Sequence, residues 1–127
     1  MQSRHHLIAL TLHGDKGLAK HYRNVTIDLC WAWIINPAAC VRFVKEFLLA
    51  APSNKLLTFG GDYASVENIV GHAAVARQGL AQALSELVEE KWLTEAAALE
   101  LVEPLMRGNA RALFPTFHEA IPAGGKV

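Results

Sequence analysis

Three polar side chains come at or near the ends of apolar runs that are rich in strand-forming residues. His13 follows LIALTL, Asp28 lies within NVTIDLCW, and Asp62 follows KLLTFGG. Imidazole and carboxylate groups are the side chains that most often transfer protons in enzymes. If the three runs are parallel strands, these polar residues collect at the carboxyl edge of one sheet, where α/β folds place their sites.

Strand alternation predicts which residues face the helices that cover such a sheet, because neighbouring residues of a strand point to opposite sides. In the second run the hydrophobic side consists of Val25, Ile27 and Leu29. In the third run Leu57 and Phe59 share one side, and Leu56, Thr58 and Asp62 share the other. We expect Leu57 and Phe59 to form the covered side, with Leu56 and Thr58 on the polar side beside Asp62.

Each candidate residue also has a structural alternative. Asp62 can cap the long helix that follows it. Asp28 can accept a bond from a neighbouring backbone N–H, or pair with Arg23 or Lys55. His13 can be a strand-end histidine with satisfied hydrogen bonds. Spacing by itself leaves these alternatives open.

Aromatic residues follow the second run. Trp31 and Trp33 can line a pocket, with Asp28 beside them, although burial in the core is the commoner use of aromatic side chains. We take Trp31 and Asp28 as candidate substrate-pocket residues. His72, beside Gly71 in a helical stretch, is interpreted as structural.

The bulk composition indicates one packed domain over residues 1–127, with a formal net charge of zero. A balanced chain without a basic stripe gives no electrostatic reason to expect a nucleic acid or an anionic membrane as partner. Cys30 and Cys40 form no CxxC pair, which fits a reducing compartment. No apolar stretch reaches the roughly 18 residues of a transmembrane helix, so we expect a soluble cytoplasmic protein.

Helix signals separate the strand-like runs. Residues 14–23 suffice for a short helix or turn. Asn36 is a good N-cap, and Pro37 suits the first helical position because its missing N–H has no partner there. Pro52 ends this helix, whose apolar face is Val41, Val44, Phe47 and Leu48. The order strand, helix, strand, helix, strand implies parallel strands over residues 7–13, 24–31 and 55–61, with right-handed crossovers.

Two further helices are predicted after Asp62. The first, over residues 66–91, carries one apolar stripe: Ile69, Val70, Ala73, Ala76, Leu80, Ala83, Leu84, Leu87 and Val88. The second is capped by Thr94, and its apolar face is Ala98, Leu99, Val102 and Met106. Pro104 is expected to kink this helix, and Gly108 to break it before the short segment NARALF.

The segments TLHGD, NVTIDLCW, KLLTFGGD and EAAALELVEPLMRGNARALF, in this order, resemble the carboxyl-terminal part of an amidohydrolase-related protein. That family belongs to the metal-dependent amidohydrolases, which are built on a (β/α)8 barrel. The resemblance extends from about His6 to Phe114. It implies an α/β fold that is a partial TIM-type barrel: three parallel strands similar to barrel strands six to eight, followed by a helical segment.

The resemblance also implies roles for single residues. Asp62 matches the aspartate that binds the metal or its water and takes a proton from that water. His13 matches a histidine that contacts the metal or the substrate, and Asn109 matches a structural position. The implied cofactor is a divalent metal, zinc above all, which lowers the pKa of bound water to about 7. Gly60 and Gly61 would let the chain turn at the barrel mouth.

The chain departs from the family pattern in its metal ligands. The family has a His-x-His pair on its first strand and further ligands on the fourth and fifth strands. His5 and His6 are adjacent and precede the first predicted strand. Asp62 and His13 are therefore at most two of the three protein ligands that a catalytic zinc needs, and three strands cannot close a barrel.

Three hypotheses follow. The first is a carboxyl-terminal segment of a metal-dependent hydrolase or lyase that acts on a small-molecule substrate and is inactive without a complementary amino-terminal half. The second is a non-enzymatic α/β module that forms a homo-oligomer by burying the face that would line the barrel. The third, a doubly wound enzyme or ligand binder, lacks a GxGxxG or GxxxxGK[ST] loop after any strand.

Overall fold

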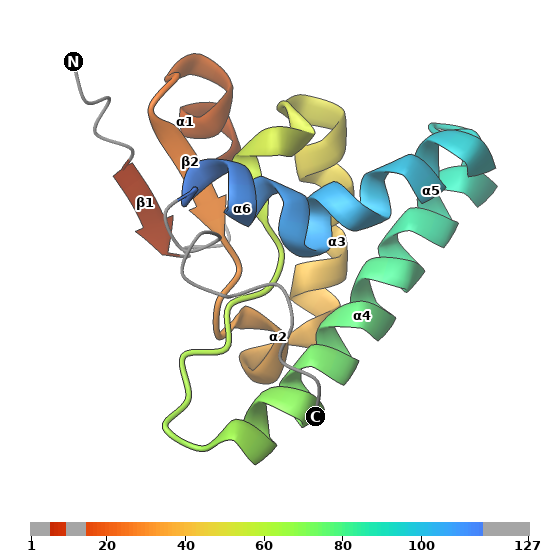
Figure 1. Ribbon diagram of the computed structural model, residues 1–127. Coiled ribbons are helices and arrows are strands. Elements are labelled where there is room, and N and C mark those ends of the chain that lie inside the picture. Colours follow the sequence, from red (N-terminus) through yellow and green to blue (C-terminus); the bar gives the residue numbers. More distant parts are fainter. Residues whose placement is uncertain (1–5, 10–14, 116–127) are drawn as a thin grey trace.

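The computed structural model describes residues 6–9 and 15–115. This part of the chain is mixed α/β and mostly helical, with three short parallel strands in the sheet order β1-β2-β3 (Figure 1). The strands are β1 (His6–Ala9), β2 (Val25–Asp28) and β3 (Leu56–Leu57). The helix α1 (Asp15–His21) connects the first two strands, and α2 (Ala32–Ile35), α3 (Pro37–Ala50) and the turn η1 (Ser53–Lys55) connect the second and third. The predicted alternation of parallel strands and helices is therefore confirmed, with strands shorter than predicted.

The register of the sheet corrects the predicted faces of the third strand. Ile27 is paired with Leu56, and Asp28 with Leu57. Paired residues of neighbouring strands share a face of the sheet, so Leu56 belongs to the hydrophobic face of Ile27 and joins its core cluster. Leu57 lies on the face of Asp28. The prediction that Leu57 forms the covered side was wrong because both positions are leucine, and only pairing with β2 distinguishes them.

Strand β2 ends earlier than predicted because Asp28 starts a turn. Its Oδ1 accepts a hydrogen bond from the backbone N–H of Cys30 at 3.0 Å. Such a bond from an aspartate to the backbone two residues later mimics a backbone turn. The chain then forms α2, which the sequence did not predict, and Trp31 stands before this helix rather than within a strand.

Helix α3 has the predicted start and the predicted buried face. The side chain of Asn36 accepts a hydrogen bond from the N–H of Ala39 at 3.0 Å, and Pro37 occupies the first turn. Val41, Val44 and Phe47 are buried in the core. The predictions for this helix are therefore confirmed.

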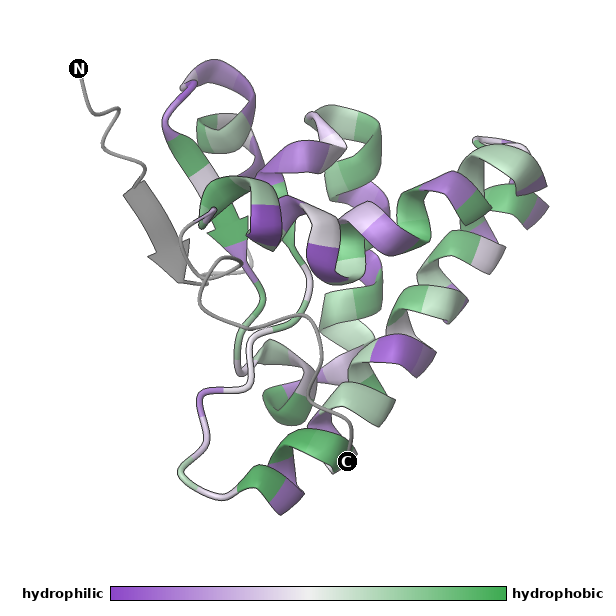
Figure 2. Cartoon of the chain, viewed as in Figure 1, coloured by the Kyte–Doolittle hydropathy of each residue, from purple (hydrophilic) through white to green (hydrophobic). Residues whose placement is uncertain are grey.

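Helix α4 (Val66–Glu89) packs along α3. Most of the predicted stripe is buried, but Val70 is 69% exposed, and the buried face also contains His72 and Gly79. A Cβ on Gly79 would lie 2.1 Å from Cζ3 of Trp33, so only glycine allows the indole to pack against the helix. In Figure 2 hydrophobic and hydrophilic segments alternate along the ribbon of α4, as expected of a helix with one buried and one exposed side.

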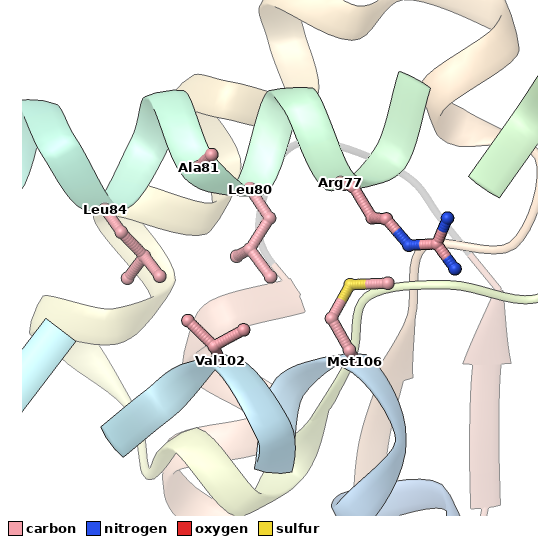
Figure 3. Close-up of a pocket in the computed structure, with 6 residues that line it drawn as sticks. All are labelled: Arg77, Leu80, Ala81, Leu84, Val102 and Met106. Atoms are coloured by element: carbon pink, nitrogen blue, oxygen red, sulfur yellow. The ribbon is translucent and has the colours of Figure 1, made fainter. Parts of the chain in front are cut away.

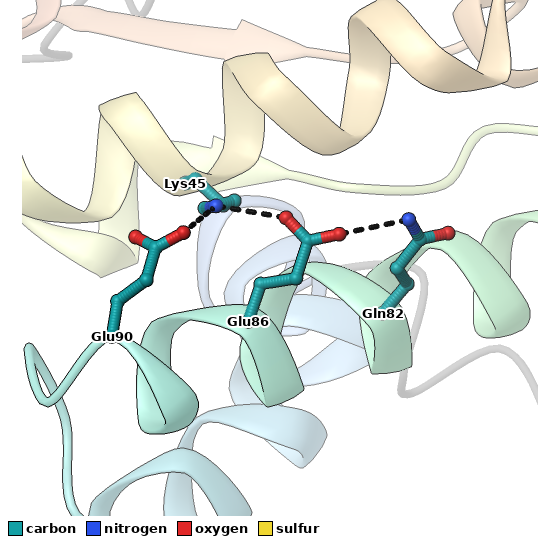
Figure 4. Close-up of polar contacts among 4 residues, drawn as sticks. All are labelled: Lys45, Gln82, Glu86 and Glu90. Carbon is teal, nitrogen blue, oxygen red and sulfur yellow. Dashed lines mark hydrogen bonds and ion pairs between the residues drawn. The ribbon is translucent and has the colours of Figure 1, made fainter.

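A charged cluster joins the exposed margins of α3 and α4. The Nζ of Lys45 lies 2.8 Å from Glu86 and 2.5 Å from Glu90, and Gln82 donates a further hydrogen bond to Glu86 (Figure 4). Glu86 and Glu90 are one helical turn apart, so both carboxylates reach the same ammonium group.

The helix after α4 begins where it was predicted, but the segment that follows it differs from the prediction. The side chain of Thr94 accepts from the N–H of Ala97, which confirms it as the cap of α5 (Glu95–Glu103). A π-helical turn, η2 (Pro104–Gly108), follows directly and leads into α6 (Asn109–Leu113). The N–H of Asn109 donates to the carbonyl of Pro104, five residues earlier. This helical turn therefore contains one residue more than an α-helical turn, and the helix continues through it. Gly108 is helical, and the predicted break there was wrong.

The predicted apolar face of α5 is only partly buried. Ala98 is buried, whereas Leu99 is 67% exposed and Val102 is 40% exposed.

Among the helices of residues 15–115, none combines the length and the hydrophobicity that a membrane-spanning helix needs.

The carboxyl-terminal helices close one edge of the sheet. Asn109 donates from Nδ2 to the carbonyls of Leu56 at 2.9 Å and Ser53 at 2.7 Å. Thr58 donates its N–H and its hydroxyl to the carbonyl of Leu105, at 3.4 and 2.7 Å. Backbone groups of β3 that face away from β2 are thereby paired, as buried backbone groups must be. Asn109 is therefore structural, but through bonds to a distant segment rather than through the cap or turn bond that we expected.

Candidate site at the carboxyl end of the sheet

Asp62 lies on the loop between β3 and α4, beyond the carboxyl end of the sheet. It is exposed, and its φ of 43° is in the left-handed region, which aspartate tolerates better than most residues. The helix α4 has Ser65 as its N-cap residue, without a side-chain cap bond. Asp62 therefore does not cap that helix, and its carboxylate faces solvent and a neighbouring indole.

The two glycines before Asp62 allow close packing of the loop. A Cβ on Gly60 would lie 3.2 Å from Sγ of Cys30, and a Cβ on Gly61 would lie 3.3 Å from Cγ1 of Ile69. Both distances are tighter than ordinary side-chain contacts. The loop therefore lies against the end of β2 on one side and against α4 on the other.

Trp31 holds the Asp62 carboxylate in place. Its Nε1 donates to Oδ2 of Asp62 at 3.3 Å, and its ring centroid lies 4.6 Å from that of Tyr63. Trp31 is 40% exposed, so one part of the indole packs on the loop and another part meets solvent. The structure brings together the predicted pocket residue Trp31 and the predicted catalytic residue Asp62.

Asp28 and Cys30 form the inner part of the same region. Burial raises the pKa of the half-buried Asp28 carboxyl, and its bond from the Cys30 N–H opposes that effect. The thiol of Cys30 donates to the carbonyl of Gly60 at 3.3 Å. Burial, and then the negative charges of Asp28 and Asp62, raise the pKa of this thiol, so it stays protonated at neutral pH. Asp28 thus makes the backbone bond that was its structural alternative, while remaining beside the site.

His13, the second predicted catalytic and metal-binding residue, lies outside the described residues. Its place beside Asp62 therefore stays a prediction.

His72 is the residue near the site that sequence reasoning did not select. It is 1% exposed, and its ring meets Phe59 and Tyr63 nearly edge-on, with centroids 5.1 and 5.6 Å away. In the described part of the chain neither ring nitrogen has a hydrogen-bond partner. The sequence does indicate that His72 is buried, because it lies three residues after Ile69 and four before Ala76, on the apolar stripe of the helix.

The described residues by themselves do not fit a zinc site. No group of three His, Cys, Asp or Glu side chains in this part of the chain is arranged to hold a metal. Asp28 is bound to a backbone N–H, and the protonated Cys30 thiol is a donor rather than a metal ligand. Asp62 is the candidate ligand whose carboxylate is exposed.

A separate groove of about 250 Å³ lies between α4 and the α5–η2 segment. Figure 3 shows Val102 and Met106 opposite Leu80 and Arg77 across it. Its walls are apolar apart from Arg77, and Asp62 is not among its lining residues. The groove results from incomplete packing of α5 on α4 and belongs to another part of the molecule than the site.

No protein-family model matches this sequence, and no curated protein or solved structure matches it either.

Proposed function

We propose that this chain is the carboxyl-terminal segment of an amidohydrolase-like hydrolase of a small-molecule substrate. In this proposal the chain forms the last three strands of a TIM-type barrel, and Asp62 is its reactive carboxylate. Trp31 and Asp28 line the substrate pocket. The missing metal ligands come from a complementary amino-terminal half, so the chain is inactive alone.

The strand order is the observation that best supports the proposal. The strands are neighbours in chain order and all parallel, as in a singly wound (β/α) barrel. Helices α1, α3 and α4 form one continuous layer, because α3 contacts both of the others (Figure 1). The exposed Asp62 lies beyond the carboxyl ends of the strands, where barrel enzymes place their catalytic groups.

The geometry of Asp62 suits a proton acceptor. Its carboxylate is exposed to solvent on one side and fixed by the Trp31 indole on the other. A carboxylate held beside a water molecule can take a proton from it and pass the proton on. The same exposure leaves Asp62 available to a partner half, since none of its described contacts encloses it.

The β3 edge sets a condition on assembly. In a closed barrel the last strand pairs with the first, yet Asn109 and Leu105 already bond the outward groups of Leu56 and Thr58. The carbonyl of Thr58 also accepts from Nε1 of Trp33 at 2.6 Å. A complementary half must therefore displace these bonds at the β3 edge, or pair its own strand with β1 instead.

Reconstitution tests the proposal. The chain is co-expressed with the amino-terminal half of an amidohydrolase-related protein that carries His-x-His, and zinc retained after gel filtration is measured by atomic absorption. We expect the wild-type complex to retain zinc and to hydrolyse 4-nitrophenyl acetate. Asp62→Asn should lose most of both, whereas Glu100→Gln, at an exposed position of α5, should change neither. Failure of every related half to complement, or zinc retention that is insensitive to Asp62→Asn, contradicts the proposal.

A second candidate function is self-association without catalysis. Four large apolar side chains on α2 and on the first turns of α4, two elements in contact, are 45–77% exposed: Ile34, Ile35, Val66 and Val70. Exposed apolar surface can mark an interface. Light scattering distinguishes this function: a chain that remains monomeric at high concentration is not a self-associating module.

A further inference from the structure

His72 supports the loop that carries Asp62. Its buried ring lies against Phe59 at the start of this loop and Tyr63 at its end. One turn earlier on α4, Ile69 lies beside Gly61 in the middle of the loop, since a Cβ on Gly61 would lie 3.3 Å from Cγ1 of Ile69. One side of α4 therefore holds residues 59–63 at both ends and in the middle.

The chemistry of this support depends on the charge of the imidazole. Burying the neutral ring between two aromatic rings costs much less hydration free energy than burying a charged ring. A protonated ring would be buried with no hydrogen-bond partner among the described residues, and an unpaired buried charge is strongly unfavourable. Burial accordingly lowers the pKa of His72 below its usual value of 6.5.

We propose that His72 is a positioning residue for Asp62, and that its protonation releases the loop of residues 59–63. The inference rests on the proposed function only for the catalytic role of Asp62. The dependence of the loop on His72 holds whether or not the chain belongs to a hydrolase.

The surrounding titratable and charged groups do not compensate the charge. The nearby groups are Tyr63 and Asp62 on the loop, Asp28 at the end of β2, Cys30 after it, and Glu67 and Arg77 on α4. In the described part of the chain none of them is hydrogen-bonded to the imidazole, and burial is the cause of its lowered pKa.

The sign of the pH effect follows from proton linkage. The open loop exposes His72 and binds a proton near its usual pKa, whereas the closed loop binds one only at lower pH. The closed loop is therefore fully favoured above about pH 6.5. Opening becomes progressively easier as the pH falls below that value, and the effect levels off once the lowered pKa is passed.

Nuclear magnetic resonance of the full chain tests the proposal through the three indole N–H signals and the glycine amides, from pH 8 to pH 5. We expect the Trp31 indole and the amides of Gly60 and Gly61 to shift together, with a midpoint below 6.5. The indole of Trp33 should stay constant, because it is buried and bonded to Thr58. Trp31 and glycine signals that do not move over this range would overturn the proposal.

Two variants connect the transition to His72. His72→Gln and His72→Phe do not titrate in this range, so each should abolish the shared transition. Its persistence in either variant contradicts the inference. If His72→Phe does not fold, the test uses His72→Gln together with the pH titration of the Cε1–H signal of His72 in the wild-type chain. A titration midpoint of 6.5 or higher for that signal also contradicts the inference.

Asp62→Asn separates this effect from titration of the carboxylate. The glycine amides of that variant should keep the transition of the wild-type chain, because His72 is unchanged, and loss of the transition contradicts the inference. The zinc measurement and this titration use different signals, so the proposed function and the positioning role can fail independently.

Discussion

The indole N–H of Trp31 donates to Oδ2 of Asp62 at 3.3 Å, across a separation of 31 residues in the chain. Trp31 follows β2 and Asp62 follows β3, so this bond joins the carboxyl ends of neighbouring strands. The Trp31 ring also lies against Tyr63, the residue after Asp62. The aromatic residue predicted to line a pocket therefore orients the carboxylate predicted to act in it.

Replacing Trp31 with phenylalanine removes the donor and keeps an aromatic ring beside Tyr63. We expect the free energy of unfolding to fall by about 1 kcal/mol or less, because a hydrogen bond between exposed groups contributes little net stability. Urea unfolding followed by circular dichroism measures this change. Trp92→Phe, at a side chain that is 63% exposed, is the matched control and should leave the midpoint unchanged. A loss above about 3 kcal/mol would instead identify Trp31 as a core residue.

Asn109→Ala should destabilise the chain by about 2–4 kcal/mol. The substitution leaves the carbonyls of Leu56 and Ser53 without their donor, and each unpaired buried group costs about 1–3 kcal/mol. Urea unfolding is again the measurement. Asn68→Ala, at an exposed position of α4, is the control and should change stability by less than about 0.5 kcal/mol. Equal effects of the two substitutions would show that Asn109 does not close the β3 edge.

Two glycines of α4 should respond in opposite directions to alanine. Gly79→Ala places a Cβ 2.1 Å from Trp33 and should destabilise by about 1–3 kcal/mol or more through overpacking. Gly71→Ala meets no atom within 4 Å and should stabilise by up to about 1 kcal/mol, because alanine has the higher helix propensity. Thermal unfolding compares the two variants directly. Destabilisation by Gly71→Ala, or tolerance of Gly79→Ala, would contradict this packing of α2 on α4.

Glu86→Gln should change the acid dependence of stability. The hydrogen bond from Lys45, and then that from Gln82, lower the pKa of Glu86 below its usual value of 4.5 (Figure 4). The ionised carboxylate therefore stabilises the fold fully above about pH 4.5, and this contribution is lost as the pH falls through the lowered pKa. The difference in Tm between wild type and variant should be largest above pH 4.5 and shrink below it. A Tm difference for Glu86→Gln that stays constant across this pH range would exclude the interaction.

Local signals in the sequence predicted most of the helices. Asn36 with Pro37, and Thr94, begin α3 and α5 as expected, because a cap acts on N–H groups two or three residues away. Hydrophobic periodicity located α4 and most of its buried face. These signals lie within a few residues of the structure that they specify, so one sequence suffices to read them.

Contacts between distant segments decided the rest. The face of Leu56 follows from its pairing with Ile27 on the neighbouring strand. The bonds of Asn109 to the β3 edge, and the packing of the His72 ring against Phe59 and Tyr63, join residues that no local pattern connects. Caps and periodicity thus determined where the helices begin and which sides are apolar. The tertiary structure decided which apolar side meets which, because that choice depends on packing between segments that meet only in the folded chain.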